Sequence, residues 1–211
     1  SDFNEVLVSM NEVSQALSAK SFDETIEMVR TGKADIAVSK LSRTGERARI
    51  VAFSSPYITL RHALLFNRLN LKQKSADEDV GDYIRHFHGT LGVIEKSAYE
   101  TFATMYFPDA KVVSLKNWSA VVDAAIDGTV DAGYRDEFAV RAVGLDQPET
   151  SISLRPITID DARSAISVAV PWNKPMLLAI VNQVIDDRPR KMNADDVMGL
   201  YRASIAEKGE Q

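Results

Sequence analysis

The spacing of hydrophobic residues along the chain predicts short helices that alternate with short strands. Phe22, Ile26 and Val29 recur at helical spacing, and Ser21 before them and Gly32 after them are typical of a helix start and a helix end. The predicted helices lie at 3–10, 22–31, 98–106, 120–126, 175–185 and 194–206, and the predicted strands at 13–17, 35–38, 91–94, 112–113, 130–134 and 166–170. This alternation indicates an α/β fold.

One helix-to-strand junction occurs twice in the chain. Residues 32–36 read Gly-Lys-Ala-Asp-Ile and residues 128–132 read Gly-Thr-Val-Asp-Ala. Two similar units so far apart suggest two lobes, each with its own sheet. We expect lobe one to comprise 1–60 and 168–211 and lobe two to comprise 61–167.

Composition excludes several classes of protein. The 211 residues are 45% hydrophobic and 26% charged, which excludes a disordered chain, and the apolar run 176–181 is far too short to cross a bilayer. A net charge of −5 disfavours nucleic acid as a partner, and the absence of cysteine excludes disulfides, thiolate metal sites and a cysteine nucleophile. No secretory signal is visible at Ser1, so we expect a cytosolic protein, a mature form or an excised fragment.

The first candidate for chemistry is the polar segment 39–48, which follows the predicted strand 35–38. Ser42, Thr44 and Arg47 lie here beside a possible helix start. Backbone N–H groups at a helix start and an arginine fork both bind carboxylates. The alternative is a solvated capping turn.

Two more candidates follow predicted strands. Ser97 comes after 91–94, at the start of a predicted helix, and Asp136 comes after 130–134. Ligands of open α/β sheets bind just outside the carboxyl ends of the strands. The alternative for both residues is that they merely cap the helices that follow.

Several motifs, taken in order, resemble the type II periplasmic binding proteins. Gly32-Lys33-x-Asp35 precedes Ser42-x-Thr44-x-Glu46-Arg47 and Phe53-Ser54-x-Pro56-Tyr57; Gly92-Val93, Ser97, Phe107-Pro108, Gly128-x-x-Asp131-Ala132 and Asp136 follow. The pattern is closest to the bacterial amino-acid-binding solute-binding family, and ionotropic glutamate receptor ligand domains are similar. The resemblance covers about residues 3–185.

This resemblance implies an α/β fold of two lobes with a ligand cleft between them, and it assigns a role to each candidate. Arg47 would bind the α-carboxylate of an amino acid, helped by Thr44. Ser42 would accept a bond from the α-ammonium, Ser97 would donate to the carboxylate, and Asp136 would pair with the ammonium.

The resemblance further implies binding without chemistry, no metal and no cofactor. The ligand would be an amino acid or a related small carboxylate. The module would be periplasmic or extracellular and would serve a membrane transporter or receptor.

The chain departs from the family pattern at several positions. Asp2-Phe3-Asn4 resembles the motif that opens the family's first helix, so the preceding first strand is expected to be absent. Lys40 and Lys96 stand where the family usually has glycine; each either faces an acidic ligand side chain or is solvated. Ala52 replaces an aspartate of the family pattern.

Two rival functions remain open from the sequence. A dehydratase on the same fold would need a general acid, for which Glu95, His62 and Asp136 are the candidates. A degenerate domain that binds nothing is the other rival. His62 is also interpretable as a structural histidine with satisfied hydrogen bonds.

The remaining histidines and the tryptophans suggest no cofactor. His86 and His88 lack a carboxylate cluster at metal spacing, which disfavours a metal site. We expect Trp118 and Trp172 to be packing residues.

Overall fold

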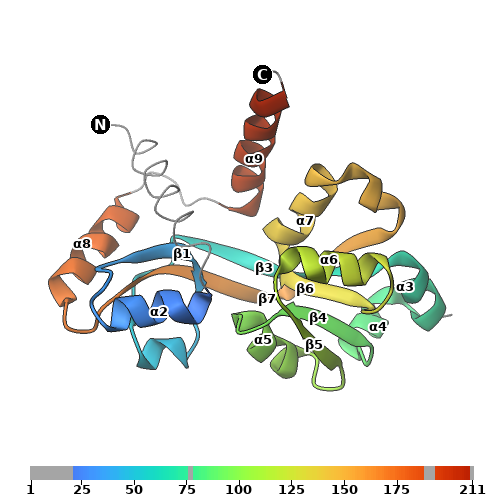
Figure 1. Ribbon diagram of the computed structural model, residues 1–211, viewed down its shortest axis with the longest axis horizontal. Coiled ribbons are helices and arrows are strands. Elements are labelled where there is room, and N and C mark those ends of the chain that lie inside the picture. Colours follow the sequence, from blue (N-terminus) through green and yellow to red (C-terminus); the bar gives the residue numbers. More distant parts are fainter. Residues whose placement is uncertain (1–20, 76–77, 188–192, 210–211) are drawn as a thin grey trace. The chain divides into compact units, whose positions relative to one another are not determined.

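A computed structural model describes residues 21–75, 78–187 and 193–209 of the chain (Figure 1). The chain divides into two compact units: unit 1 comprises 1–59 and 165–192, and unit 2 comprises 60–164 and 193–211. The predicted helix 3–10, the predicted strand 13–17 and the motif at 2–4 lie outside the described residues.

Unit 1 contains a small antiparallel set of strands with helices packed on it. Its elements are α2 (Phe22–Arg30), β1 (Ala37–Ser42), the 3-10 turn η1 (Arg47–Arg49), β2 (Ala52–Phe53), the last part of β7 (Leu154–Val170) and α8 (Pro175–Asp186). Both β1 and β2 pair with β7.

The start and end of α2 follow the sequence signals. The Ser21 side chain accepts a hydrogen bond from the Glu24 N–H, and Gly32 takes the left-handed conformation with φ +74°. Ile26 and Val29 are buried against Leu41 of β1. The amphipathic stripe read from the sequence is therefore the face that α2 buries.

The Phe-Ser-x-Pro-Tyr motif at 53–57 forms hydrogen bonds to β7 and α8 within unit 1. The Ser54 backbone N–H donates to the Val168 carbonyl at 2.9 Å, and the Ser54 hydroxyl oxygen accepts from the Val168 N–H at 3.0 Å. The next residue, Ser55, donates its N–H to Asn182 Oδ1 of α8 at 2.8 Å. The motif thus joins β7 to α8 and has a structural role.

Unit 2 is built on a mixed sheet. Its elements are most of β3 (Ile58–Asn67), α3 (Arg68–Ser75), α4 (Val80–Arg85), β4 (Thr90–Ile94), α5 (Ala98–Tyr106), β5 (Lys111–Leu115), α6 (Trp118–Ile126), β6 (Ala132–Asp136), α7 (Glu137–Asp146), η2 (Pro148–Ile152), the first part of β7 and α9 (Ala194–Gly209). Strand β4 pairs in parallel with β5 and β6, and β6 pairs antiparallel with β3.

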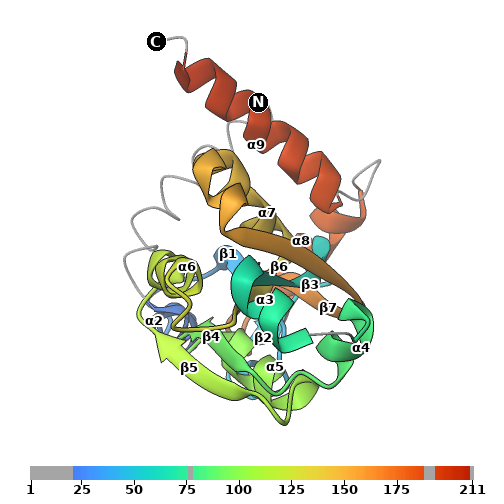
Figure 2. The same ribbon diagram turned by 90° about the vertical axis from the view of Figure 1, so that its right-hand side faces the viewer.

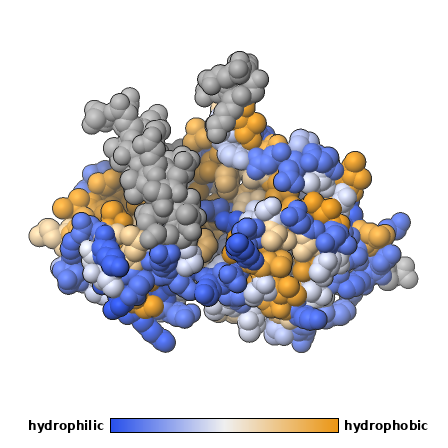
Figure 3. Space-filling view, in the orientation of Figure 1, coloured by the Kyte–Doolittle hydropathy of each residue, from blue (hydrophilic) through white to orange (hydrophobic). Residues whose placement is uncertain are grey.

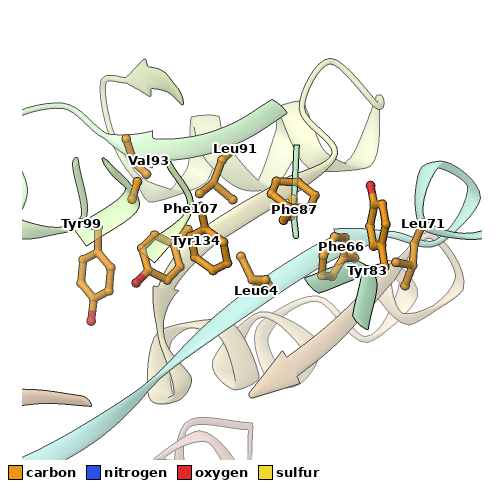
Figure 4. Close-up of a cluster of buried hydrophobic side chains, with 12 residues drawn as sticks. Leu64, Phe66, Leu71, Tyr83, Phe87, Leu91, Val93, Tyr99, Phe107 and Tyr134 are labelled. Atoms are coloured by element: carbon orange, nitrogen blue, oxygen red, sulfur yellow. The ribbon is translucent and has the colours of Figure 1, made fainter. Parts of the chain in front are cut away.

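Alternation along β3 creates two cores in unit 2. Leu64 and Phe66 join one cluster, which includes the side chains of α4 and α5 and is drawn in Figure 4. Ala63 and Leu65 join another cluster with residues of α6 and α7. Successive side chains of a strand point to opposite faces, so the sheet is covered by helices on both faces.

The expectation of a separate sheet in each lobe needs correction. The hydrogen-bonded strand order is β1-β7-β3-β6-β4-β5, with β2 also on β7. This continuity arises because β3 and β7 each contribute residues to both units. The units change at 59/60 and 164/165, against predicted boundaries at 60/61 and 167/168.

The last helix differs from the expectation that 168–211 belongs to lobe one. Helix α9 lies beside α7 of unit 2 (Figure 2). The Phe138 and Tyr201 rings pack with centroids 5.5 Å apart, and Arg141 Nη1 lies 2.7 Å from Asp195 Oδ1. These contacts, which the periodicity of α9 alone does not specify, assign 193–209 to unit 2.

Helix α6 starts two residues before its predicted start. Asn117, not Ser119, is the cap, because Asn117 Oδ1 accepts a hydrogen bond from the Ala120 N–H at 2.9 Å. Either residue type suits this position, so the choice depends on the backbone that leaves β5.

One surface of unit 1 is apolar. Met176, Ile180 and Val184 recur at helical spacing on α8 and are 74%, 56% and 50% exposed. Hydrophobic residues are visible over α8 in Figure 3. None of the described helices combines the length and the apolar character that a membrane span requires.

Candidate functional site

The predicted carboxylate-binding residues of unit 1 lie at the end of β1. Ser42 is the last residue of β1 and is buried. The Thr44 hydroxyl oxygen accepts a hydrogen bond from the Arg47 backbone N–H at 3.2 Å, so Thr44 fixes the turn and retains its own O–H as a donor. The structure therefore brings Ser42, Thr44 and Arg47 together.

Arg47 is a buried guanidinium with few partners. Its residue is 8% exposed, its Nη1 donates to the Ser42 carbonyl at 3.4 Å, and its guanidinium carbon lies 5.5 Å from the centre of the Phe22 ring. Burial lowers the pKa of Arg47, and the charges of Asp23 and Glu46 oppose that shift. No ion pair of Arg47 with a carboxylate is found among residues 21–75, 78–187 and 193–209. Because a buried cation without a counter-ion is unfavourable, this arrangement favours an added anion.

The helix expected to start within 39–48 does not form. Only the three-residue turn η1 (Arg47–Arg49) follows Thr44. Gly45 and the polar residues around it favour a tight turn over a longer helix. The anion-binding capacity of unit 1 therefore depends on the Arg47 side chain rather than on a helix dipole.

Ser97 of unit 2 has an unused hydroxyl. It occupies the N-cap position of α5 with extended backbone angles, φ −91° and ψ 160°, but its side chain makes no capping bond. The residue is 6% exposed, and its Oγ has no hydrogen-bond partner in the part of the chain that is described. A buried hydroxyl without a partner costs about 1–3 kcal/mol, which a ligand acceptor could recover.

Asp136 ends β6 and is 2% exposed. Its Oδ1 accepts a hydrogen bond from the Ala139 N–H at 3.0 Å, so the interpretation that Asp136 caps α7 is confirmed. The cap uses one side of the carboxylate. A carboxylate has several acceptor positions, so capping and ammonium binding are compatible.

The electrostatic surroundings of Asp136 include the neighbouring residue Arg135, which strand alternation predicts to point to the other side of the strand. Arg135 Nε lies 3.6 Å from Asp136 Oδ2, and the Arg135 guanidinium carbon lies 5.4 Å from the centre of the Trp118 ring. Arg135 follows Gly133 by two residues and therefore shares its face of the sheet. The contact with Trp118 places the Arg135 side chain on the α6 side of the sheet.

Lys40 and Lys96 share a backbone conformation that explains their place in the family pattern. Both have positive φ, +53° and +57°, which glycine adopts without strain. The glycine that the family usually has at these two positions is therefore explained by the positive φ of the backbone there. Lys96 is exposed and Lys40 is half-buried.

His62 is a structural histidine, as one of the two interpretations predicted. It is completely buried, its Nδ1 is hydrogen-bonded to the Tyr134 hydroxyl, and its Nε2 lies 2.7 Å from Ser164 Oγ. Burial lowers the pKa of His62 to about 4, while the charge of Asp136 opposes the shift. His62 is therefore neutral at pH 7. Glu95, another candidate general acid, is exposed.

The two tryptophans differ. Trp118 packs against the second core cluster of unit 2, as expected. Trp172 is 62% exposed, so the prediction that it is a packing residue is wrong. Within the described residues, no group of three His, Asp or Glu side chains could hold a metal ion.

The predicted site residues thus fall into two groups. Ser42, Thr44 and Arg47 belong to unit 1, and Ser97 and Asp136 belong to unit 2. Each group offers what one end of an amino acid requires: a cationic donor in unit 1, and a hydroxyl and a carboxylate in unit 2.

Comparison with known protein families decides the class. The model of the bacterial extracellular solute-binding proteins, family 3, matches residues 4–197 of this chain. The chain belongs to this family. The resemblance to solute-binding proteins that the motifs indicated is thereby confirmed.

One curated family relative is 28% identical over 132 residues: the lysine/arginine/ornithine-binding periplasmic protein of Escherichia coli (strain K12). The alignment covers 62% of this chain and 48% of the relative. The chain therefore spans about half the length of this relative.

Solved structures confirm the two-lobed α/β fold. A binding component of an ABC transporter from Wolinella succinogenes DSM 1740, complexed with lysine, has a TM-score of 0.68 at 21% identity, covering 83% of this chain and 75% of the other. An amino acid ABC transporter substrate-binding protein from Streptococcus pneumoniae, bound to L-arginine, has a TM-score of 0.66 at 23% identity, covering 84% and 76%.

Proposed function

We propose that this member of the solute-binding family binds a free amino acid in the periplasm and delivers it to a membrane transporter or receptor. Arg47 and Thr44 bind the α-carboxylate. Ser97 donates to the same carboxylate, and Asp136 and the Ser42 carbonyl accept from the α-ammonium. The protein binds its ligand without chemical change.

The single observation that carries this proposal is the state of Arg47. A guanidinium that is 8% exposed, with one long hydrogen bond and no carboxylate partner among the described residues, is poorly compensated. A carboxylate that received a bidentate pair of hydrogen bonds would supply the missing compensation. The burial of the Arg47 guanidinium thus supports an anionic ligand group.

Asp136 supports an amino acid over a simple carboxylate. Besides the position that caps α7, the Asp136 carboxylate has further acceptor positions, which suit the N–H donors of a ligand ammonium. An α-ammonium has three such donors. Ser42 contributes a carbonyl in unit 1 that suits the same group.

The comparisons support the same class of ligand. The Escherichia coli relative is named for lysine, arginine and ornithine, and the two solved structures contain lysine or L-arginine. Lysine, arginine and ornithine are all α-amino acids. The family is extracellular by its description, which supports a periplasmic location.

Calorimetric titration tests the proposal through the ligand's functional groups. The amino acid that binds most tightly is compared with its deaminated acid and its decarboxylated amine. We expect the complete amino acid to bind more tightly than either. Asp136→Asn should weaken amino-acid binding much more than binding of the deaminated acid. Equal weakening of both would show that Asp136 is only a helix cap.

A further inference from the structure

The carboxyl ends of three parallel strands in unit 2 lie at the same edge of the sheet. Strands β5, β4 and β6 lie in that order and run in the same direction (Figure 1). Trp118 follows the end of β5, Ser97 follows the end of β4, and Arg135 and Asp136 end β6. This is the edge at which open α/β sheets bind ligands.

Arg135 reaches across this edge. It starts from β6 and stacks on Trp118, which follows β5, although β4 separates those two strands. Gly133 leaves room for the indole ring of Trp118 on this face of the sheet. A Cβ atom at Gly133 would lie 2.8 Å from Val121 and 3.4 Å from Trp118, so the ring packs where a side chain would be.

Apart from the 3.6 Å ion pair between Arg135 Nε and Asp136 Oδ2, no described residue uses the donors of this pair. The Arg135 side chain is 20% exposed, and no hydrogen bond from its guanidinium to any residue in the described ranges is found. Trp118 Nε1 is buried and likewise has no partner there. Both groups are donors only, so the group that satisfies them must be an acceptor.

From this arrangement we infer that the ligand is a dicarboxylic amino acid, of the L-aspartate or L-glutamate class, and that Arg135 binds its second carboxylate. The inference rests on the proposed function, in which Arg47 takes the α-carboxylate and Asp136 the ammonium. Among the described residues neither Arg47 nor Arg135 has a carboxylate in bidentate contact, so two guanidiniums and one carboxylate are complementary to a ligand with two carboxylates and one ammonium.

Charge complementarity separates this ligand from those in the related structures. The side-chain cation of lysine or arginine would meet two site arginines that have no bidentate carboxylate contact among the described residues. Like charges that meet in a desolvated site are strongly unfavourable. Lys96, exposed beside Ser97, adds a further positive charge to unit 2.

The test is calorimetric titration of the wild-type chain with L-glutamate, L-aspartate, L-lysine, L-arginine and L-alanine. We expect an acidic amino acid to bind at least about tenfold more tightly than L-alanine, and both cationic ones to bind less tightly than L-alanine. Arg135→Gln should weaken the acidic ligand by about 30-fold or more while changing L-alanine affinity less than about threefold. Arg141→Gln is the matched control, because Arg141 of α7 pairs with Asp195 of α9 instead of contacting Trp118. It should change neither the affinity for the acidic ligand nor the affinity for L-alanine.

Each contrary outcome has a distinct meaning. Tighter binding of lysine or arginine than of glutamate and aspartate overturns the inference and leaves the proposed function standing. Acidic preference that survives Arg135→Gln, in a variant with a wild-type unfolding midpoint, removes Arg135 from the site. If no amino acid binds, the proposed function fails, and the inference fails with it.

Discussion

Acidification should destabilise this protein through His62. The imidazole is completely buried and bonded to the hydroxyls of Tyr134 and Ser164, and each hydroxyl can donate or accept. Neutral imidazole offers one donor and one acceptor, so both bonds are satisfied in the neutral state. Protonation would convert the acceptor nitrogen to a donor and place a cation among Tyr99, Phe102 and the other rings that pack on it.

The magnitude follows from the difference between the folded and unfolded pKa values of His62. Burial lowers the folded pKa to about 4, whereas the unfolded value is about 6.5. The unfolded chain therefore binds the proton first, so stability is complete above about pH 6.5 and is lost as the pH falls toward the folded value. The expected loss is about 2 kcal/mol at pH 5 and about 3 kcal/mol by pH 4.

Urea denaturation at about pH 7.5 and about pH 5 measures this loss. The chain has three histidines, and the two others, His86 and His88, are exposed. We expect His62→Gln to lose about 2 kcal/mol less than wild type between the two pH values, whatever its stability at pH 7.5. A variant that replaces both His86 and His88 by Gln is the control and should follow wild type. Parallel losses in wild type and His62→Gln would refute the reasoning.

Three further predictions concern the free energy of unfolding. Lys96→Gly should raise it by about 0.5–1 kcal/mol by relieving positive φ, measured by urea denaturation, and Lys96→Ala should give no such gain. Asp131→Ala should lower the free energy of unfolding by about 3–4 kcal/mol, since this 3% exposed carboxylate accepts a hydrogen bond from the Thr90 backbone N–H of β4 at 2.7 Å. Lys74→Ala, which removes the half-exposed ion-pair partner of Asp131, should cost less than about 1 kcal/mol. Equal costs for the two variants would contradict this account. Ser97→Ala should cost less than about 0.5 kcal/mol, because the Ser97 side chain makes no capping bond. Asn117→Ala, which loses the capping bond of α6, should cost about 1 kcal/mol. If thermal unfolding ranks the two variants in the reverse order, the assignment of these two helix caps is wrong.

Elements with local signals were predictable from the sequence, and elements held by distant contacts were not. Helix α5 (Ala98–Tyr106) has the predicted bounds because its cap position and apolar stripe lie within one short segment. For β7 (Leu154–Val170), the sequence predicted only 166–170. Charged, largely exposed positions in the first part of β7 lack a strand pattern, and its pairing with other strands holds it extended.

The candidate site divides in the same way. Ser97 follows β4, whose end at Ile94 was located from the sequence. The strands that precede Arg47 and contain Asp136, β1 and β6, end four and two residues beyond their predicted ends at 38 and 134. The contact of Arg135 with Trp118 could not be predicted, because it spans β4 and depends on the close packing of the Trp118 ring on Gly133.

The central claim is that Arg47 binds the α-carboxylate of an amino acid, and titration calorimetry of Arg47→Ala tests it most directly. Arg49→Ala is the matched control, since Arg49 lies in the same turn and is exposed. With the amino acid that wild type binds most tightly, we expect Arg47→Ala to lose about 30-fold or more in affinity and Arg49→Ala to change less than about threefold. Arg47→Ala should keep a cooperative unfolding transition. Wild-type affinity in a folded Arg47→Ala protein would contradict the account.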